Sequence, residues 1–251
     1  MKQFKADKYT IRLMNNNNKD ELLKVQELRY KYLLRVYNPS LPEEGLDDDG
    51  YDQYANSILV IDDTKDVIAG AYRVADLDTL KGHKFLLEDE YDIAPLRESG
   101  YNFAELSRAV VHPDYQNGFV IQLLLLAIYH YVIEHNCHFF LGLCSFHGSD
   151  PSKYMQGLAL LKRDYLYQKY TLKPICNAFP LDYIKEEEID EIEAKKQLPG
   201  LLKMYLAIGH KVGVEGCIDY NFNSCDVLII LDLDNINKRY LERFLRININ
   251  E

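Results

Sequence analysis

Glu105, Ser107 and Arg108 lie close together near the middle of the chain and have side-chain types that acid–base chemistry uses. The residues around them, 103–111, are mostly apolar or β-branched and predict a strand. Alternation along a strand puts Glu105 and Ser107 on one face and Arg108 on the other, unless a β-bulge intervenes. The Glu105 carboxylate is able to accept a proton from a substrate or to form an ion pair with Arg108. From residue types alone, the ion pair is the simpler interpretation.

A second candidate region is acidic and rich in turn formers. Residues 38–56 contain Asp49 and Asp52 next to Asp47 and Asp48, together with several prolines and glycines. This composition predicts a long loop, and loops of this length are commonly functional or mobile. The simplest interpretation of its carboxylates is a solvated acidic turn.

Other reactive residue types lack the spacing that their chemistry needs. His112, His135 and His138 have no cysteines or carboxylates at catalytic-zinc spacing, so no metal site is predicted. Ser145 is followed by Phe-His-Gly and does not lie in a Gly-x-Ser-x-Gly motif, which leaves a hydrolase nucleophile elbow unsupported.

The elements that must position these residues follow from the periodicity of apolar residues. Strands are predicted at residues 9–14, 57–61, 67–74, 103–111, 139–146 and 227–233, and helices at 19–33, 119–133, 151–166, 201–208 and 240–245. A hairpin is followed by a strand–helix–strand unit. This order predicts an α+β fold with a mixed, largely antiparallel sheet, a central parallel splice and flanking helices.

We expect a single domain over residues 1–251. Residues 173–197 contain two prolines and an acidic run, and we interpret them as an inserted segment. Residues 198–251 then form a C-terminal helix–strand–helix extension.

Composition restricts the partners and the compartment. The formal net charge of −10 argues against nucleic acid, which requires a basic face. A local basic patch is formed in sequence by Lys153, Lys162, Arg163, Lys169 and Lys173, although an ordinary solvated helix face is the simpler interpretation. The five cysteines form no C-x-x-C pair, which favours reduced thiols in a cytosol. The N-terminus lacks the apolar stretch of a secretory signal, and the apolar segment 119–133 is too short to span a bilayer.

Several pieces of the sequence, in the same order along the chain, match one known family. They are Arg29-Tyr30, Asp49-Gly50-Tyr51-Asp52, Gly70-Ala71-Tyr72-Arg73, Glu105-Leu106-Ser107-Arg108 with Val111-His112-Pro113-Asp114-Tyr115, Gly142-Leu143-Cys144-Ser145 with Gly148-Ser149-Asp150-Pro151, and residues 198–206 with Asp219-Tyr220-Asn221-Phe222. Each piece alone is weak, but the ordered set covers nearly the whole chain. The chain therefore resembles the ornithine-lipid acyltransferases, a branch of the GNAT superfamily related to acyl-homoserine-lactone synthases.

The resemblance implies an N-acyltransferase. The expected reaction moves a long fatty acyl chain, with or without a 3-hydroxyl group, from an acyl carrier protein thioester to the amine of an amino acid or amino alcohol. No covalently bound cofactor is expected, because the phosphopantetheine thioester of the carrier protein is the donor. Ornithine, glycine, lysine, serine and serinol all remain open as acceptors. We expect a cytoplasmic enzyme, and peripheral association with the inner face of the membrane is left open.

The resemblance also implies roles for particular residues. Glu105 becomes the general base for the incoming ammonium, with Ser107 and Arg108 beside it in the catalytic group. Arg29 and Arg73 are expected to pair with Asp49 and Asp52 and to order the substrate side. Donor contacts are expected from Val110, Val111, Gln116, Gly118 and Ser145.

The expected donor loop departs from the superfamily pattern R/Q-x-x-G-x-G/A. Gln116 and Gly118 are closer together than in that pattern, and Val120 replaces the last small residue. A pyrophosphate needs several backbone N–H groups with small residues around them, so this loop favours a carrier protein over coenzyme A. The alternatives to the main hypothesis are a lactone-synthase-like enzyme and a non-catalytic acyl-carrier or lipid-binding module.

Overall fold

The computed structural model describes residues 1–15, 17–247 and 249. It divides the chain into two compact units. The first unit consists of Met1–Lys84, Asn102–Cys137 and Arg239–Glu251, and the second of Phe85–Tyr101 and His138–Lys238. In the described part of the chain, no helix is long and apolar enough to cross a membrane.

The first unit contains a sheet in which every neighbouring pair of strands is antiparallel. Its strands lie in the order β1 (Phe4–Ala6), β2 (Tyr9–Leu13), β3 (Asn56–Asp62), β4 (Val67–Asp76) and β6 (Phe103–Val111). The hairpin predicted from the β-branched runs is the β3–β4 pair, and the strand predicted at 103–111 is β6.

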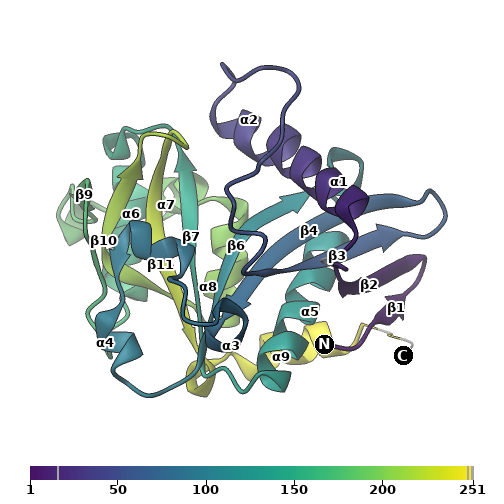
Figure 1. The fold of residues 1–251 in the computed structure, drawn as a ribbon. Helices are drawn as coiled ribbons and strands as arrows, with labels where there is room; N and C mark the ends of the chain where they lie inside the picture. Colours follow the sequence, from purple (N-terminus) through teal and green to yellow (C-terminus); the bar gives the residue numbers. More distant parts are fainter. Residues whose placement is uncertain (16, 248, 250–251) are drawn as a thin grey trace. The chain divides into compact units, whose positions relative to one another are not determined.

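Two helices cover opposite faces of this sheet (Figure 1). Helix α1 (Lys19–Arg29) begins at Asn18, whose side chain accepts a hydrogen bond from the Glu21 N–H. It continues through the π-helical segment Tyr30–Leu34 into α2 (Arg35–Tyr37). Its buried residues Val25 and Leu28 belong to one apolar cluster with residues of strands β3, β4 and β6.

Helix α5 (Phe119–Glu134) packs closely against the other face. A Cβ atom at Gly70 of β4 would lie 2.7 Å from Val120 Cγ1 and 3.1 Å from the Val110 carbonyl oxygen. The close approach of α5 therefore requires glycine at this position. Along the chain, a short 3-10 turn at Pro113–Tyr115 connects β6 to α5. The short helix α3 (Leu77–Leu80) follows β4.

The second unit is built on four antiparallel strands in the order β7 (Phe139–His147), β11 (Ser224–Asp232), β10 (Lys211–Asp219) and β9 (Ala178–Pro180). A small separate pair joins β5 (Tyr91–Asp92) to β8 (Lys173–Pro174). Its helices are α4 (Ala94–Arg97), α6 (Met155–Tyr165), α7 (Glu191–Gln197) and α8 (Gly200–Ile208), with 3-10 turns at Leu86–Asp89, Pro151–Tyr154, Glu186–Glu188 and Leu233–Asn235. Helix α9 (Lys238–Leu245) begins at the last residue of this unit.

The predicted fold class, an α+β fold of GNAT type with a mixed and largely antiparallel sheet, is confirmed. The C-terminal part differs from the prediction, because it is helix–strand–strand–helix and includes β10. Strand β10 was not predicted because Gly213, Glu215 and Gly216 interrupt its alternation of apolar and polar residues. A Cβ at Gly216 would lie 2.1 Å from the ring of Phe179, so this glycine makes room for the neighbouring strand β9. The assignment of residues 173–197 as an insertion stays a prediction.

Gly70 offers a direct test of the packing between the sheet and α5. Gly70→Ala should destabilise the protein by about 1–3 kcal/mol, because the added methyl group overlaps Val120 and backbone that cannot move freely. Gly200→Ala is the matched control, since no atom lies within 4 Å of the added Cβ at the start of α8. Urea unfolding measured for both variants should show a lower midpoint only for Gly70→Ala; equal midpoints would contradict the packing.

Candidate active site

Strand β6 contains a bulge where it passes β4. Arg73 of β4 lies opposite Ser107, but Ala71 lies opposite Val110, so two steps along β4 correspond to three along β6. Arg108 lies within the irregularity and has a left-handed backbone with φ of 57°. A non-glycine residue in this conformation costs roughly 1 kcal/mol, so the surrounding contacts must hold it there.

The bulge determines which side chains share a face. Opposed residues of an antiparallel pair point to the same side, and Glu105 lies opposite Ala75 just as Ser107 lies opposite Arg73. Glu105, Ser107 and Arg73 therefore share one face. Arg108 reaches that face too, because it donates to Asp49, which also accepts from Arg73. Simple alternation would have put Arg108 on the opposite face, and the bulge overrides it.

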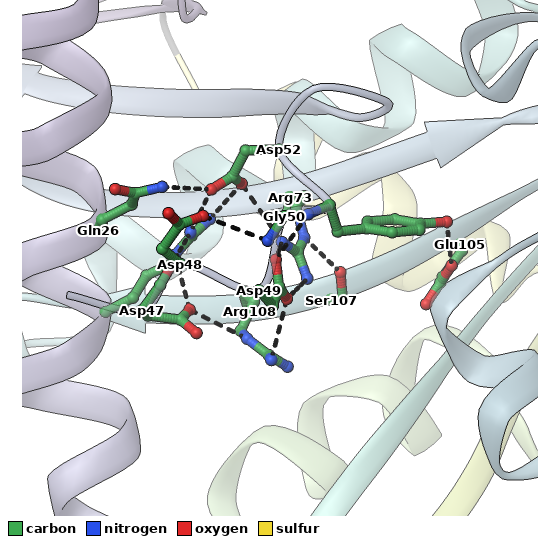
Figure 2. Close-up of polar contacts among 12 residues, drawn as sticks. Gln26, Asp47, Asp48, Asp49, Gly50, Asp52, Arg73, Glu105, Ser107 and Arg108 are labelled. Atoms are coloured by element: carbon green, nitrogen blue, oxygen red, sulfur yellow. Dashed lines mark hydrogen bonds and ion pairs between the residues drawn. The ribbon is translucent and has the colours of Figure 1, made fainter. Parts of the chain in front are cut away.

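The loop of residues 38–55 brings its carboxylates onto this face (Figure 2). Arg29, the last residue of α1, holds Asp52 in a bidentate pair, with Nη1–Oδ1 and Nη2–Oδ2 distances of 2.7 and 2.6 Å. Arg73 holds Asp49 in the same way, with distances of 2.8 and 2.7 Å. Both arginine side chains are 1% exposed. Two planar, bidentate pairs therefore fix the loop to α1 and β4.

Further contacts join the two pairs into one network. Arg73 Nη1 lies 3.3 Å from Asp52 Oδ1, and Arg108 Nη2 lies 3.1 Å from Asp49 Oδ2. Asp47 Oδ2 lies 2.9 Å from Arg29 Nε and 3.0 Å from Arg108 Nε. We call these six side chains the Arg–Asp network. Its three arginines and three aspartates carry equal and opposite formal charge.

The interpretation of this loop as a solvated acidic turn is wrong. Asp47 is 4% exposed and Asp52 is 7% exposed, because their carboxylates face arginines of α1, β4 and β6. The expected partners Arg29 and Arg73 do lie against Asp49 and Asp52. Their role in substrate binding stays a prediction.

The electrostatics of the network favour the charged forms. Burial acts to raise the pKa of Asp49, but the hydrogen bonds and charge of Arg73, with the charge of Arg108, outweigh it and lower the pKa to about 2. Burial likewise acts to raise the pKa of Asp52, but the hydrogen bonds and charge of Arg29 outweigh burial, so the pKa of Asp52 is lowered. For Arg73, burial is outweighed by the hydrogen bonds to Asp49, which raise the pKa.

The loop is also held by hydrogen bonds whose donors are uncharged groups. The Asp47 N–H donates to the Gln26 carbonyl at 3.2 Å, and Gln26 Nε2 donates to Asp52 Oδ2 at 3.1 Å. Nearer the start of the loop, the Tyr30 hydroxyl donates to the Pro42 carbonyl at 3.0 Å. The loop is therefore hydrogen-bonded at Asp47 and Asp52 to α1, and at Pro42 to the π-helical segment that follows it.

Glu105 is buried, with 2% of its surface exposed. The Tyr51 hydroxyl lies 3.4 Å from Glu105 Oε2. Figure 2 shows Glu105 beside the residues of the Arg–Asp network. Arg108 donates to Asp47 and Asp49, so the ion pair with Glu105 is not needed to explain its position. The structure thus brings Glu105, Ser107 and Arg108 together with the predicted Asp and Arg residues.

Three residues in this region have contacts that the sequence does not predict. Asp47 pairs with Arg29 and Arg108, Tyr51 contacts Glu105, and Gln26 donates to Asp52. The signal that was present is the run Asp-Asp-Asp-Gly-Tyr-Asp, in which one aromatic residue interrupts acidic ones. An aromatic side chain in a polar loop commonly has a specific contact for its hydroxyl group.

The expected donor-binding residues come from both units, and their role in donor binding stays a prediction. Val110 is buried opposite Ala71, and Val111 lies opposite Gly70 at the end of β6. Gln116 Nε2 donates to the Val111 carbonyl at 3.2 Å. Gly118, with φ of 87°, precedes the first residue of α5. Ser145 lies on β7 of the second unit, so the predicted set does not form one cluster within either unit.

The basic patch expected from the sequence is largely neutralised by neighbouring carboxylates. Lys162 pairs with Asp182, Arg163 with Asp164 and Glu191, and Lys169 with Asp232. Lys153 and Lys173 are exposed. The simpler interpretation, a solvated surface with its own ion pairs, fits these contacts better than a preformed docking patch.

Two clusters in the second unit bring possible metal-ligand atoms within 4.8 Å of one another: His138, Asp232 and Asp234, and Glu90, Asp219 and Asp226. Burial, with the charges of Asp226 and Asp219, raises the pKa of Glu90 to about 8. A protonated Glu90 relieves the repulsion in that cluster. His138 Nε2 lies 3.2 Å from Asp232 Oδ1, as in an ordinary His–Asp pair.

Similarity to a known protein family defines the class of this enzyme. Residues 28–126 match a family model described as an acetyltransferase (GNAT) domain. The protein is an acyltransferase of the GNAT class.

Full-length relatives define the family more closely. An L-ornithine N(alpha)-acyltransferase of Rhodobacter capsulatus is 32% identical over 249 residues, covering 95% of both chains. A protein of the same name from Agrobacterium fabrum is 28% identical over 243 residues, covering 90% of this chain and 82% of its own. The chain belongs to the L-ornithine N(alpha)-acyltransferase family.

A solved structure shows the same fold at low sequence identity. FeeM, an N-acyl amino acid synthase from uncultured soil microbes, superposes with a TM-score of 0.52 at 10% identity, covering 90% of this chain and 92% of that one. This likeness bears on the fold alone.

The depressed pKa of Asp49 predicts a pH-dependent contribution to stability. Because its folded pKa of about 2 lies below its ordinary value, the contribution is complete at neutral pH and is lost as pH falls from about 4 to 2. Allowing for solvent screening of a partly exposed group, Asp49→Asn should cost about 1–2 kcal/mol at pH 7.

The measurement is urea unfolding of the wild type and the variant between pH 7 and pH 3, and the gap between them should shrink at the acid end. Asp48→Asn is the control, because Asp48 is exposed and its carboxylate accepts only the nearby Gly50 N–H among the contacts found. A gap that stays constant with pH would contradict the assignment.

Proposed function

We propose that this protein transfers a long-chain acyl group from an acyl carrier protein thioester to the α-amine of an amino acid, with L-ornithine as the first acceptor to test. The chain's 32% identity over 95% of its length to a protein named for that acceptor supports the choice. The observation that carries the proposal is a buried carboxylate, Glu105, on the same face of the sheet as the Arg–Asp network.

The reaction requires a base. An amino acid enters with a protonated amine, and only the neutral amine attacks a thioester. In the proposal Glu105 accepts that proton, directly or through one water molecule. The amine nitrogen then forms a bond to the thioester carbonyl carbon, and the C–S bond breaks as the thiolate leaves. The nitrogen loses one further proton to become the amide, and that proton balances the one that the thiolate takes up. The products are an N-acyl amide and the free carrier thiol.

The environment of Glu105 suits this role. Glu105 is 2% exposed and its Oε2 lies 3.4 Å from the Tyr51 hydroxyl, so the carboxylate is shielded from bulk water and has a fixed neighbour. The neighbouring residues of β6 act by position: Ser107 Oγ accepts from Arg73 Nε at 3.1 Å, and Arg108 holds Asp47 and Asp49. We assign both as positioning residues for the loop above Glu105.

The Arg–Asp network has a structural role in the proposal. The charges of Arg29, Arg73, Asp49 and Asp52 are paired with one another, so none of the four is required to bind substrate directly. Their function is to hold the loop of residues 38–55 in one arrangement on the substrate side. Buried ion pairs of this kind keep their geometry, because breaking one leaves an uncompensated charge.

The carrier protein is favoured as donor by the start of α5. The superfamily's phosphate loop is shortened here, Gln116 is used to hold Val111, and Val120 replaces a small residue. A phosphopantetheine arm has one phosphodiester and needs fewer N–H donors than a nucleotide pyrophosphate. Contacts from Val110, Val111, Gly118 and Ser145 to the donor remain part of the proposal. The alternative of a non-catalytic lipid-binding module is not supported, since the relatives are acyltransferases.

Donor preference can be tested with purified protein and L-ornithine. A long-chain acyl carrier protein thioester should give a higher kcat/KM than the matching acyl coenzyme A, with release of free thiol and formation of N-acyl ornithine detected by mass spectrometry. Glycine, lysine and serine in parallel reactions establish the acceptor. Equal use of the two donors would count against the carrier protein, and no thiol release with any amine would count against the whole proposal.

Replacement of Glu105 tests the base. Glu105→Gln keeps the size of the side chain and removes its basicity, so kcat should fall by about 10²- to 10⁴-fold near neutral pH while KM for the amine changes little. Raising the pH should restore part of the rate, because more of the amine is then neutral.

The matched control is Glu21→Gln, which removes another paired carboxylate of the first unit, the partner of Arg12. It should lower the melting temperature without changing kcat. If Glu105→Gln behaved in the same way, with lower stability and an unchanged rate per folded molecule, Glu105 would be a structural residue.

A further inference from the structure

The Tyr51 hydroxyl lies between the proposed base and a backbone carbonyl. It is 3.4 Å from Glu105 Oε2 and 3.0 Å from the carbonyl oxygen of Lys84. A phenol has one proton to donate and an oxygen that can accept. This hydroxyl can therefore donate to the Glu105 carboxylate, or it can donate to the Lys84 carbonyl while its own oxygen accepts from a protonated Glu105.

We propose that Tyr51 is the positioning residue of Glu105, holding the carboxylate in place both before and after it takes the substrate proton. This inference rests on the proposed function. Before proton transfer, the hydroxyl donates to the Glu105 carboxylate. After transfer, the protonated Glu105 donates to the Tyr51 oxygen, and the Tyr51 proton turns to the Lys84 carbonyl. One O–H rotation thus serves both protonation states.

The side chain of Tyr51 is fixed by the Arg–Asp network. Its ring lies over the guanidinium of Arg73, 5.0 Å from the ring centre, and this guanidinium is itself held by Asp49 and Asp52. The backbone N–H of Tyr51 donates to Asp49 Oδ1 at 3.0 Å. Arg73 therefore positions the ring of Tyr51, and Asp49, the carboxylate that Arg73 binds, positions its backbone.

This arrangement gives the Arg–Asp network a functional consequence. The charges of the network pair with one another. Tyr51 lies in sequence between two of its members, Asp49 and Asp52, and the Tyr51 hydroxyl contacts Glu105. A loop that moved away from Arg73 would take the hydroxyl with it. The position of the base is therefore coupled to the order of the loop.

The test is a double-mutant cycle with Tyr51→Phe and Glu105→Gln, using the long-chain acyl carrier protein thioester and the accepted amine. Tyr51→Phe keeps the ring over Arg73 and removes only the hydroxyl. Its kcat should fall about tenfold, with KM for the amine changed by less than about twofold, because one hydrogen bond to a charged group is lost. Since Tyr51 acts through Glu105, the double variant should be no slower than Glu105→Gln alone.

Tyr91→Phe is the matched control, because it also removes one tyrosine hydroxyl bound to a backbone carbonyl, that of Glu215, and Tyr91 belongs neither to the loop nor to the Arg–Asp network. Its melting temperature should fall about as much as that of Tyr51→Phe, with kcat unchanged. Rates are taken per folded molecule, from the unfolding amplitude of each preparation, so that partial unfolding is not counted as lost catalysis.

The outcomes separate this inference from the proposed function. A normal kcat in Tyr51→Phe, or losses that multiply in the double variant, would overturn the positioning role and leave Glu105 as the base. A normal kcat in Glu105→Gln would overturn the base and the positioning role together. A slow Tyr51→Phe with no further loss in the double variant supports both.

Discussion

The Arg–Asp network is the interaction on which the rest of the site depends. The loop of residues 38–55 has little regular structure, and its attachment to α1, β4 and β6 relies on charged side chains with little access to water. Removing one member of a buried pair leaves an unpaired charge, at a cost of about 3–5 kcal/mol. The buried members therefore hold one another in place, and a loop without a helix or strand over most of its length acquires a single conformation.

The same network explains why β6 tolerates its bulge. A left-handed backbone at Arg108 is unfavourable, but it turns the guanidinium toward Asp47 and Asp49. Two charge-assisted hydrogen bonds are sufficient to offset a backbone cost of roughly 1 kcal/mol. In return, the bulge puts Arg108 on the face that already carries Glu105 and Ser107. The irregularity of the strand and the charges of the loop thus stabilise each other.

The sequence predicted those parts of the structure in which local pattern and tertiary environment agree. The buried helix α5 and the strands β4 and β6 have strong apolar patterns, and each was located closely. Strand β10 was missed because its glycines serve contacts with other strands, which local alternation does not reveal. The bulge at Arg108 carries no glycine to mark it. The loop carboxylates looked solvated because Arg29 and Arg73 come from distant positions, and only the family resemblance joined them to Asp49 and Asp52.

Exposure distinguishes the three arginines of the network. The side chains of Arg29 and Arg73 are 1% exposed, whereas that of Arg108 is 21% exposed. An anionic group that approaches this face therefore meets Arg108 first, and it can pair with Arg108 only by competing with Asp47 and Asp49. Such competition would weaken the loop's hold on β6 while the bidentate pairs of Arg29 and Arg73 remained intact. The buried arginines thus keep Tyr51 against Glu105, and solvent and solutes reach the network through Arg108 and Asp49, whose side chains are 21% and 20% exposed.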